Sequence, residues 1–100
     1  MNTTSHYTVP DNHPAFSGHF PNMPILPGVV LLDIALQVIS DANGIALNHC
    51  SINTVKFIYP ARPGDVINIT HKHTNSGTIH FDMSTATHKI ASGSVVINPT

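Results

Sequence analysis

The longest apolar segment of the chain, residues 29–42 (VVLLDIALQVISDA), has the pattern of a buried helix. It contains neither proline nor glycine, and its apolar positions surround a helix axis on all sides. Pro27 and Gly28 mark its start, because proline is tolerated in a first helical turn, and Asn43 with Gly44 is suited to form a C-terminal cap. A helix that is apolar all round packs in the interior of a protein, so we predict that this helix lies at the centre of the fold.

After the helix the pattern changes to alternating apolar and polar positions rich in β-branched residues, which is typical of strands. We predict turns at RPGD and TNSG, and a short strand at 6–9 that a proline-rich loop over 10–27 separates from the helix. The strands that follow the helix span residues 52–60, 66–73, 78–87 and 89–97. One helix followed by antiparallel strands indicates an α+β fold whose sheet wraps the helix. Four or five strands cannot cover every side of that helix, which favours a partner subunit.

Composition narrows the class of protein. One hundred residues, 41% of them apolar, predict one domain over 1–100 with a limited core. Only 9% of the residues are charged, against about 25% in ordinary soluble domains, so we expect another subunit to cover part of the surface. The formal net charge of −1 provides no basic field for nucleic acid.

The sequence also lacks the usual signs of export or membrane insertion. Its start, MNTTSHYTVPDNHP, has neither a basic beginning nor an apolar core, so it does not predict a signal peptide. No apolar run reaches the roughly 18 residues that span a bilayer, because Pro27, Gly28 and Asp33 interrupt the best candidate. The single cysteine, Cys50, excludes an intrachain disulfide. We therefore expect a cytoplasmic protein that binds no membrane.

Asp33 is the residue that requires a chemical explanation. Its neighbours in the predicted helix are apolar except Gln37, which lies one turn later on the same face. A carboxylate in an apolar setting is strongly destabilising unless it is paired or protonated. One interpretation is that this polar pair only meets a polar group or a water in the core. The other is a general acid, because burial favours the protonated form of a carboxylic acid.

A general acid needs a base nearby, and His19 is the natural candidate. It stands in the proline-rich loop that leads into the helix, and imidazole titrates near neutral pH. A lone histidine in a loop is more often an ordinary surface residue, and the pattern alone does not place His19 beside Asp33.

Residues 13–37, HPAFSGHFPNMPILPGVVLLDIALQ, resemble the signature of the 3-hydroxyacyl-ACP dehydratases of the FabA/FabZ group. The resemblance includes GHFP, the P-x-x-P-G-V entry to the helix, an acidic residue fourteen positions after the histidine and a glutamine four positions later. It continues more weakly through VKFIYPARPGD, residues 55–65. The short chain and the stretch TVPDNHPAFSGHFP look most like the compact ApeI-like dehydratases linked to aryl polyene synthesis.

The resemblance implies a fold and a reaction. The fold is the hot-dog fold, a long helix wrapped by an antiparallel sheet, working as a homodimer or as a heterodimer with a related hot-dog subunit. The reaction removes water from a 3-hydroxyacyl chain, held on the phosphopantetheine arm of an acyl carrier protein, to give the trans-2-enoyl thioester. It belongs to fatty acid or aryl polyene biosynthesis and requires no cofactor or metal.

The resemblance also implies the site residues. His19 is expected to be the catalytic base, Asp33 the catalytic acid, and Gln37 the residue that orients Asp33. The backbone N–H of Gly28 is expected to bind the thioester carbonyl. Each active site is expected to join the histidine loop of one subunit to the helix of the other. FabZ-type enzymes usually carry glutamate where this chain has Asp33, so the aspartate resembles the FabA type.

The residue types suit this chemistry. His19 can remove the C2 proton, and a protonated Asp33 can give its proton to the departing hydroxyl. A helix N-terminus supplies N–H groups and a dipole for the enolate-like charge on the thioester oxygen. Gly28 has no side chain and so allows the acyl chain to approach closely. Aliphatic residues near the helix start are candidates to line an acyl tunnel, although core packing explains each of them as simply: Ile25, Leu26 and Val29.

Other interpretations of the chain stay open. A non-catalytic acyl-binding subunit would share the fold, although the presence of both candidate catalytic residues argues against it. A hot-dog thioesterase usually lacks the GHFP–PGV arrangement. A zinc site is a further hypothesis, because His71 and His73 share a face of one predicted strand and His80 lies across the next turn. Arg62, beside the PGD turn, is the candidate for docking an acidic carrier protein.

Overall fold

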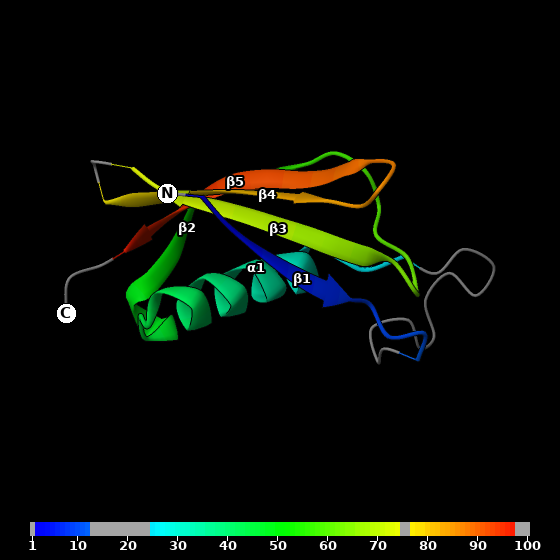
Figure 1. Ribbon diagram of the computed structural model, residues 1–100, viewed down its shortest axis with the longest axis horizontal. Coiled ribbons are helices and arrows are strands. Elements are labelled where there is room, and N and C mark those ends of the chain that lie inside the picture. Colours follow the sequence, from blue (N-terminus) through cyan, green and yellow to red (C-terminus); the bar gives the residue numbers. More distant parts are fainter. Residues whose placement is uncertain (1, 13–24, 75–76, 98–100) are drawn as a thin grey trace.

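The structure, a computed structural model, describes residues 2–12, 25–74 and 77–97. Within these ranges the chain forms the helix α1 (Gly28–Asn43), a short 3₁₀ helix η2 (Leu47–His49) and five strands. The strands are β1 (Asn2–Thr8), β2 (Cys50–Phe57), β3 (Val66–His73), β4 (Thr78–Ser84) and β5 (Lys89–Ile97). Figure 1 shows one curved sheet with α1 lying lengthwise against one of its faces.

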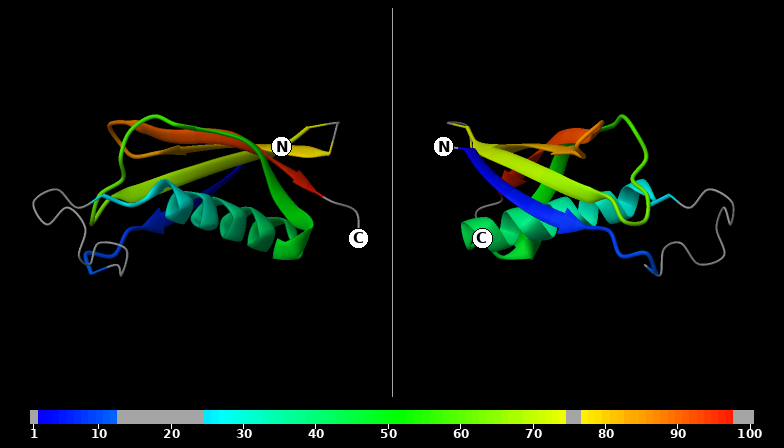
Figure 2. Two further views of the ribbon diagram at one scale, coloured as in Figure 1. Left: turned by 180° about the vertical axis from the view of Figure 1, so that it is seen from behind. Right: turned by 45° about the vertical axis from the view of Figure 1, so that its right-hand side comes forward.

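The strands lie in the order β1-β3-β4-β5-β2, and every neighbouring pair is antiparallel. The three central strands follow one another in the sequence, whereas β1 and β2 form the two edges. Both views in Figure 2 keep α1 on the same, concave side of the sheet. One helix packed on an antiparallel sheet is the α+β arrangement that the sequence predicts.

The ends of α1 follow the predicted signals. Pro27 is the N-cap with an extended backbone (φ −60°, ψ 148°), which suits the residue that precedes a helix. Gly44 is the C-cap in the left-handed conformation (φ 63°), and its N–H donates to the carbonyl of Ser40. This conformation favours glycine because a Cβ atom is strained there. The predicted helix over 29–42 is confirmed and extends by one residue at each end.

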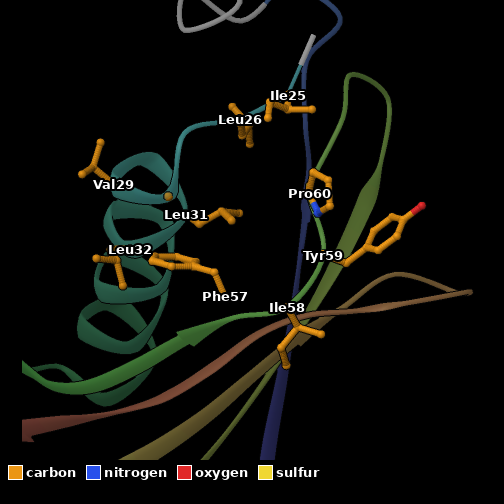
Figure 3. Close-up of a pocket in the computed structure, with 10 residues that line it drawn as sticks. Ile25, Leu26, Val29, Leu31, Leu32, Phe57, Ile58, Tyr59 and Pro60 are labelled. Carbon is orange, nitrogen blue, oxygen red and sulfur yellow. The ribbon is translucent and has the colours of Figure 1, made fainter. Parts of the chain in front are cut away.

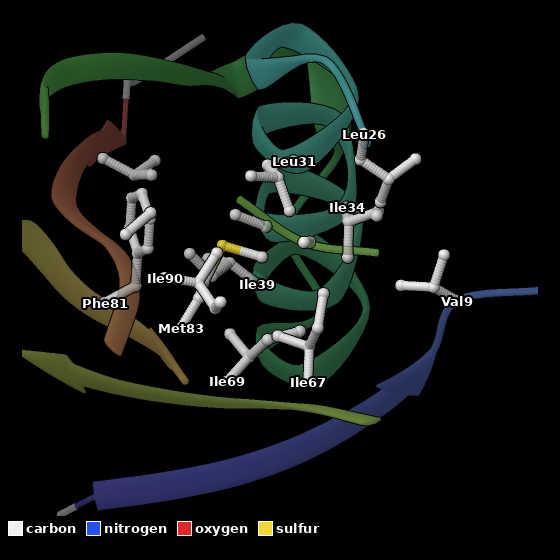
Figure 4. Packing of buried hydrophobic residues seen from close by; sticks show 14 of the residues in the cluster. Val9, Leu26, Leu31, Ile34, Ile39, Ile67, Ile69, Phe81, Met83 and Ile90 are labelled. Carbon is white, nitrogen blue, oxygen red and sulfur yellow. The ribbon is translucent and has the colours of Figure 1, made fainter. Parts of the chain in front are cut away.

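The core lies between α1 and the inner face of the sheet. Alternate residues of β3 and β4 point inward, which is the period expected of a half-buried strand. The predicted apolar face of β4, Ile79, Phe81 and Met83, is confirmed, because each of these side chains is at most 1% exposed. Figure 4 shows how the side chains of the helix interdigitate with those of the strands: Leu31, Ile34 and Ile39 from α1 against Ile67, Ile69, Phe81, Met83 and Ile90.

The expectation that the helix is buried on all sides is wrong for a single chain. Val29 is 71% exposed, and Asp33 and Gln37 are exposed as well. The physical reason is that one sheet lies against one side of α1 only, so the opposite side keeps its apolar residues in contact with solvent. In the single chain, that side of α1 is left uncovered.

Three strands differ from the prediction in length. β1 spans seven residues instead of four, because it pairs with β3 from Asn2 to Thr8, and its polar sequence gives little sign of this. β2 ends at Phe57 instead of residue 60. β4 ends at Ser84, because Thr85 turns back to donate its N–H to the His88 carbonyl at 2.8 Å.

The RPGD turn is present. The N–H of Asp65 donates to the Arg62 carbonyl at 3.1 Å, and the Asp65 side chain accepts from the Arg62 N–H at 2.9 Å. The TNSG turn lies partly outside the described residues. Among the residues described, no helix combines the length and the apolar character that crossing a bilayer requires.

Candidate active site

A cavity of about 530 Å³ opens at the N-terminal end of α1. Its walls come from residues within 25–32 on one side and, on the other, from residues 57–60, which begin at the last residue of β2. Figure 3 shows the apolar side chains of both walls. The structure therefore brings Gly28 together with all three residues predicted to line an acyl tunnel: Ile25, Leu26 and Val29.

The first turn of α1 gives this cavity its polar chemistry. N–H groups in a first helical turn have no partner within the helix, and Gly28 is both the first residue of α1 and part of the cavity wall. The first turn contains no acidic side chain. The positive end of the helix dipole therefore favours a ligand oxygen that carries partial negative charge.

Asp33 belongs to a different cavity, of about 450 Å³, on another side of the helix. It lies five positions after Gly28 in the helix, which corresponds to a rotation of about 140° around the helix axis. The two cavities share no wall residue. Asp33 is exposed in the single chain, so the predicted burial of its carboxyl group is wrong for one chain taken alone. The reason is that the sheet covers only the opposite side of α1.

Gln37 lines the same cavity as Asp33, on the next turn of the helix. Its side-chain N–H donates to the carboxylate of Asp41 at 3.0 Å. An amide side chain has a second N–H and a carbonyl oxygen, which are the groups left for Asp33. The predicted orienting role of Gln37 stays a prediction.

His19, the predicted base, lies outside the described residues, so its position relative to Asp33 and Gly28 also stays a prediction. Phe57 and Tyr59 were not predicted as site residues, yet both line the cavity at Gly28. No spacing rule signals them, because the backbone after Phe57 is irregular: the N–H groups of Ile58 and Tyr59 both donate to the Ile90 carbonyl.

The predicted zinc trio does not come together. His80 is opposite Lys72 in the register of β3 and β4, so it lies on the outer face of the sheet. His71 is 2% exposed on the inner face, and its Nε2 has no hydrogen-bond partner among the described residues. His73 bonds instead to the side chain of Asn43 at 2.7 Å. Among the described residues, no group of three potential ligands could hold a metal ion.

Arg62 lines a smaller cavity of about 130 Å³, which shares Tyr59 and Pro60 with the cavity at Gly28. Its guanidinium carbon is 5.9 Å from the centre of the Tyr59 ring. The His88 ring stacks on Tyr59 with 3.7 Å between the ring centres and 7° between the planes. This contact joins the β4–β5 turn to the loop after β2.

A family model of the ApeI-like dehydratases (ApeI dehydratase) matches residues 1–94. Among curated proteins, the 3-hydroxyacyl-[acyl-carrier-protein] dehydratase FabZ of Ehrlichia canis (strain Jake) is 38% identical over 79 residues. The match covers 65% of this chain and 53% of that protein. The chain spans about half the length of the curated relatives it matches.

Solved structures show the same fold. The dehydratase heterocomplex ApeI:P from Xenorhabdus doucetiae superposes with a TM-score of 0.79 at 20% identity, covering 98% of this chain and 88% of that chain. An uncharacterized protein from Erwinia carotovora subsp. atroseptica gives a TM-score of 0.77 at 24% identity, covering 98% and 83%.

A long helix against a five-stranded antiparallel sheet in this order makes the protein a hot-dog fold, as predicted. With the match over residues 1–94, the chain belongs to the ApeI-like dehydratase family, which confirms the resemblance found in residues 13–37.

Proposed function

We propose that the protein is a 3-hydroxyacyl-[acyl-carrier-protein] dehydratase that forms a trans-2-enoyl thioester. One observation carries the proposal: in a chain of this family, the N-terminus of α1 opens into an apolar cavity of about 530 Å³. The acyl chain fills this cavity, and the Gly28 N–H binds the thioester oxygen. Apolar walls with a few convergent polar groups are the usual composition of a small-molecule site.

The active site requires two subunits. In one chain Gly28 and Asp33 face separate cavities, so the Asp33 that acts on a given substrate comes from a second copy or a related hot-dog subunit. Apolar residues around the cavity at Gly28 support such a contact, since Val29 is 71%, Phe57 49% and Ile58 47% exposed. The second subunit also supplies the apolar setting that Asp33 lacks in one chain. The ApeI:P neighbour is itself a heterocomplex.

The elimination balances with three groups. His19 takes the C2 proton, and the electron pair of that C–H bond forms the C2–C3 double bond as the C3–O bond breaks. Asp33 gives its proton to the departing hydroxyl, which leaves as water. The Gly28 N–H binds the thioester oxygen while it carries enolate-like charge. A proton passed from His19 to Asp33 resets the site.

A thioesterase is the main competing function, because the fold does not distinguish the two. A structure of the fluoroacetyl-CoA-specific thioesterase FlK superposes with a TM-score of 0.65 at 13% identity. A non-catalytic acyl-binding subunit is the second alternative. It would bind the acyl carrier protein and leave the 3-hydroxyacyl chain unchanged in every pairing.

Mass spectrometry of 3-hydroxyacyl carrier proteins after incubation with the protein tests the proposal. We expect loss of one water per acyl chain and no release of free carrier thiol. Hydrolysis with thiol release would establish the thioesterase instead. An unchanged substrate, with the protein alone and with a related hot-dog subunit, would leave only the non-catalytic role.

A further inference from the structure

The ring of Phe57 rests against the first residue of α1. A Cβ atom built at position 28 lies 2.8 Å from Cζ of Phe57 and 3.1 Å from each Cε atom. The distances of 2.8 Å to Cζ and 3.1 Å to both Cε atoms place this Cβ position above the face of the ring, over its tip. The tip of the ring therefore lies flat against Gly28, and Figure 3 shows the Phe57 side chain extending toward the helix. Carbon atoms in favourable contact lie about 3.5–4 Å apart, so any side chain at position 28 displaces this ring.

The backbone around the ring is fixed by hydrogen bonds. The N–H groups of Ile58 and Tyr59 both donate to the Ile90 carbonyl, at 2.8 and 3.2 Å. The N–H of Leu26 donates to the Ala61 carbonyl at 2.8 Å, which ties the segment before α1 to the loop after β2. Both walls of the cavity are therefore held at the main chain. The side chain of Phe57 can still move through its two torsion angles.

Phe57 is also only half-buried, at 49% exposed, although it is one of the two aromatic side chains in the cavity wall. One end of the ring contacts Gly28, and the rest of it borders the open space. The ring therefore sets the size of the cavity next to the proposed oxygen-binding N–H, where the acyl chain passes.

We propose that Phe57 is the specificity-determining residue of this cavity. Its ring limits the length of acyl chain that the cavity accepts. Position 28 is glycine because a side chain there would collide with that ring. The inference rests on the proposed function and adds the residue that selects among its substrates.

Two variants, Phe57→Leu and Phe57→Ala, shorten the side chain in steps. The readout is kcat/KM on 3-hydroxybutyryl, 3-hydroxyhexanoyl, 3-hydroxyoctanoyl and 3-hydroxydecanoyl carrier proteins. Because each methylene in a hydrophobic pocket changes discrimination by about tenfold or more, F57A should raise the ratio of long-chain to short-chain activity at least about tenfold, and F57L by less. Val66→Ala is the matched control, since Val66 is also 49% exposed but lies at the start of β3 outside the cavity. It should keep the wild-type profile.

A second pair of variants tests the link between the two residues. Gly28→Ala keeps the backbone N–H but pushes the ring into the cavity, so it should shorten the accepted chains. In the double variant G28A/F57A the ring is absent, and the loss caused by the methyl group should largely disappear. A double variant as impaired as G28A alone would show that the methyl group obstructs the substrate itself, and would overturn this explanation of the glycine.

Failure of this inference is distinguishable from failure of the proposed function. Thermal-shift measurements with butyryl-pantetheine and decanoyl-pantetheine report chain-length preference without any turnover. An active wild type whose chain-length profile is unchanged in F57A overturns the inference and leaves the dehydratase intact. Absence of activity in the wild type removes the proposed function, while the thermal shifts still decide the role of Phe57. An F57A variant that only loses subunit association would also overturn the inference, because the ring would then belong to the subunit contact.

Discussion

The two cavities beside the first turns of α1 differ in the polar groups that they contain. The cavity at Gly28 has apolar walls, and its polar chemistry comes from the main chain at the helix N-terminus. The cavity at Asp33 has a carboxyl group, an amide and the tyrosine of β1, Tyr7, but no helix end. Under the proposed function, each cavity holds a group that the other lacks for the elimination of water. The difference supports the proposal that one chain carries two half-sites, which a second subunit brings together.

Asp33→Asn should have the largest effect among the variants of the described residues. It keeps the size and the hydrogen-bonding capacity of the side chain but removes the acidic proton, so 2-enoyl formation should fall by about 10²–10⁴-fold. Single-turnover mass spectrometry measures the loss, and urea unfolding should show an intact fold. Asp41→Asn is the matched control on the same helix, and it should retain activity. Full turnover in D33N would remove Asp33 from the mechanism.

The cavity at Gly28 is tested by a pair of variants that separates the N–H from the side chain. Gly28→Pro removes the N–H at the first helical position, where proline is well tolerated, and the extended backbone of Pro27 suits a following proline. Loss of one donor to a developing oxyanion lowers kcat by about 10²–10³-fold. Gly28→Ala introduces a Cβ atom but keeps the N–H, so on the shortest substrate it should lose much less. Equal losses in both variants would mean that the N–H has no role.

Substitution of Gln37 should lower activity less than the variants above. Comparing it with a substitution of Asp41 shows whether Gln37 acts on Asp33 or only on Asp41. Both Gln37→Ala and Asp41→Ala abolish the hydrogen bond between these two side chains, and each should lower stability by about 0.2–0.5 kcal/mol. Only Q37A should lower kcat as well, because it alone removes a neighbour of Asp33. Equal activity of the two variants would restrict Gln37 to a structural role.

His71 lies in the core beside neither cavity, so its effect should fall on stability and not on turnover. Burial first, and the charge of His73 second, hold the pKa of His71 below its ordinary value of 6.5. The unfolded chain therefore binds a proton more readily than the folded one, and stability is lost as the pH falls below 6.5 toward the folded-state pKa. The free energy of unfolding changes by at most about 1.4 kcal/mol per pH unit through this one group.

Replacing the buried imidazole tests this account. His71→Leu removes both the proton uptake and an unpartnered nitrogen, so it should flatten the pH dependence and raise the free energy of unfolding by about 1 kcal/mol at neutral pH. His80→Leu, on the exposed outer face, should leave the slope unchanged. Urea unfolding at several pH values measures both variants. A slope that persists in H71L would assign the pH dependence to other groups.

Most of the fold could be predicted because its signals are local. Proline before the helix and glycine after it placed the ends of α1 to within one residue, and strict alternation placed β3 and the inner face of β4. β1 was predicted too short, because NTTSHYT has little apolar alternation and its strand exists through pairing with β3. The end of β2 was missed because nothing in FIYP shows where the main chain leaves the ladder.

The candidate site was predicted less completely, for a physical reason. An apolar helix sequence predicts that the helix surface is buried, but it does not say whether the same chain or another chain buries it. Asp33 was therefore expected inside and is exposed in the single chain. The partner of Gln37 and the contact of Phe57 with Gly28 depend on side-chain positions in three dimensions, which no spacing rule along the chain supplies.

Mixing two inactive variants tests the division into half-sites most directly. His19→Ala and Asp33→Asn, co-expressed in equal amounts, form hybrid dimers in which one site contains only wild-type catalytic groups. With random pairing, about a quarter of all sites are intact, so the mixture should recover about a quarter of wild-type activity while each variant alone is inactive. A mixture that remains as inactive as its components, with hybrid dimers present by native mass spectrometry, would contradict a site shared between subunits.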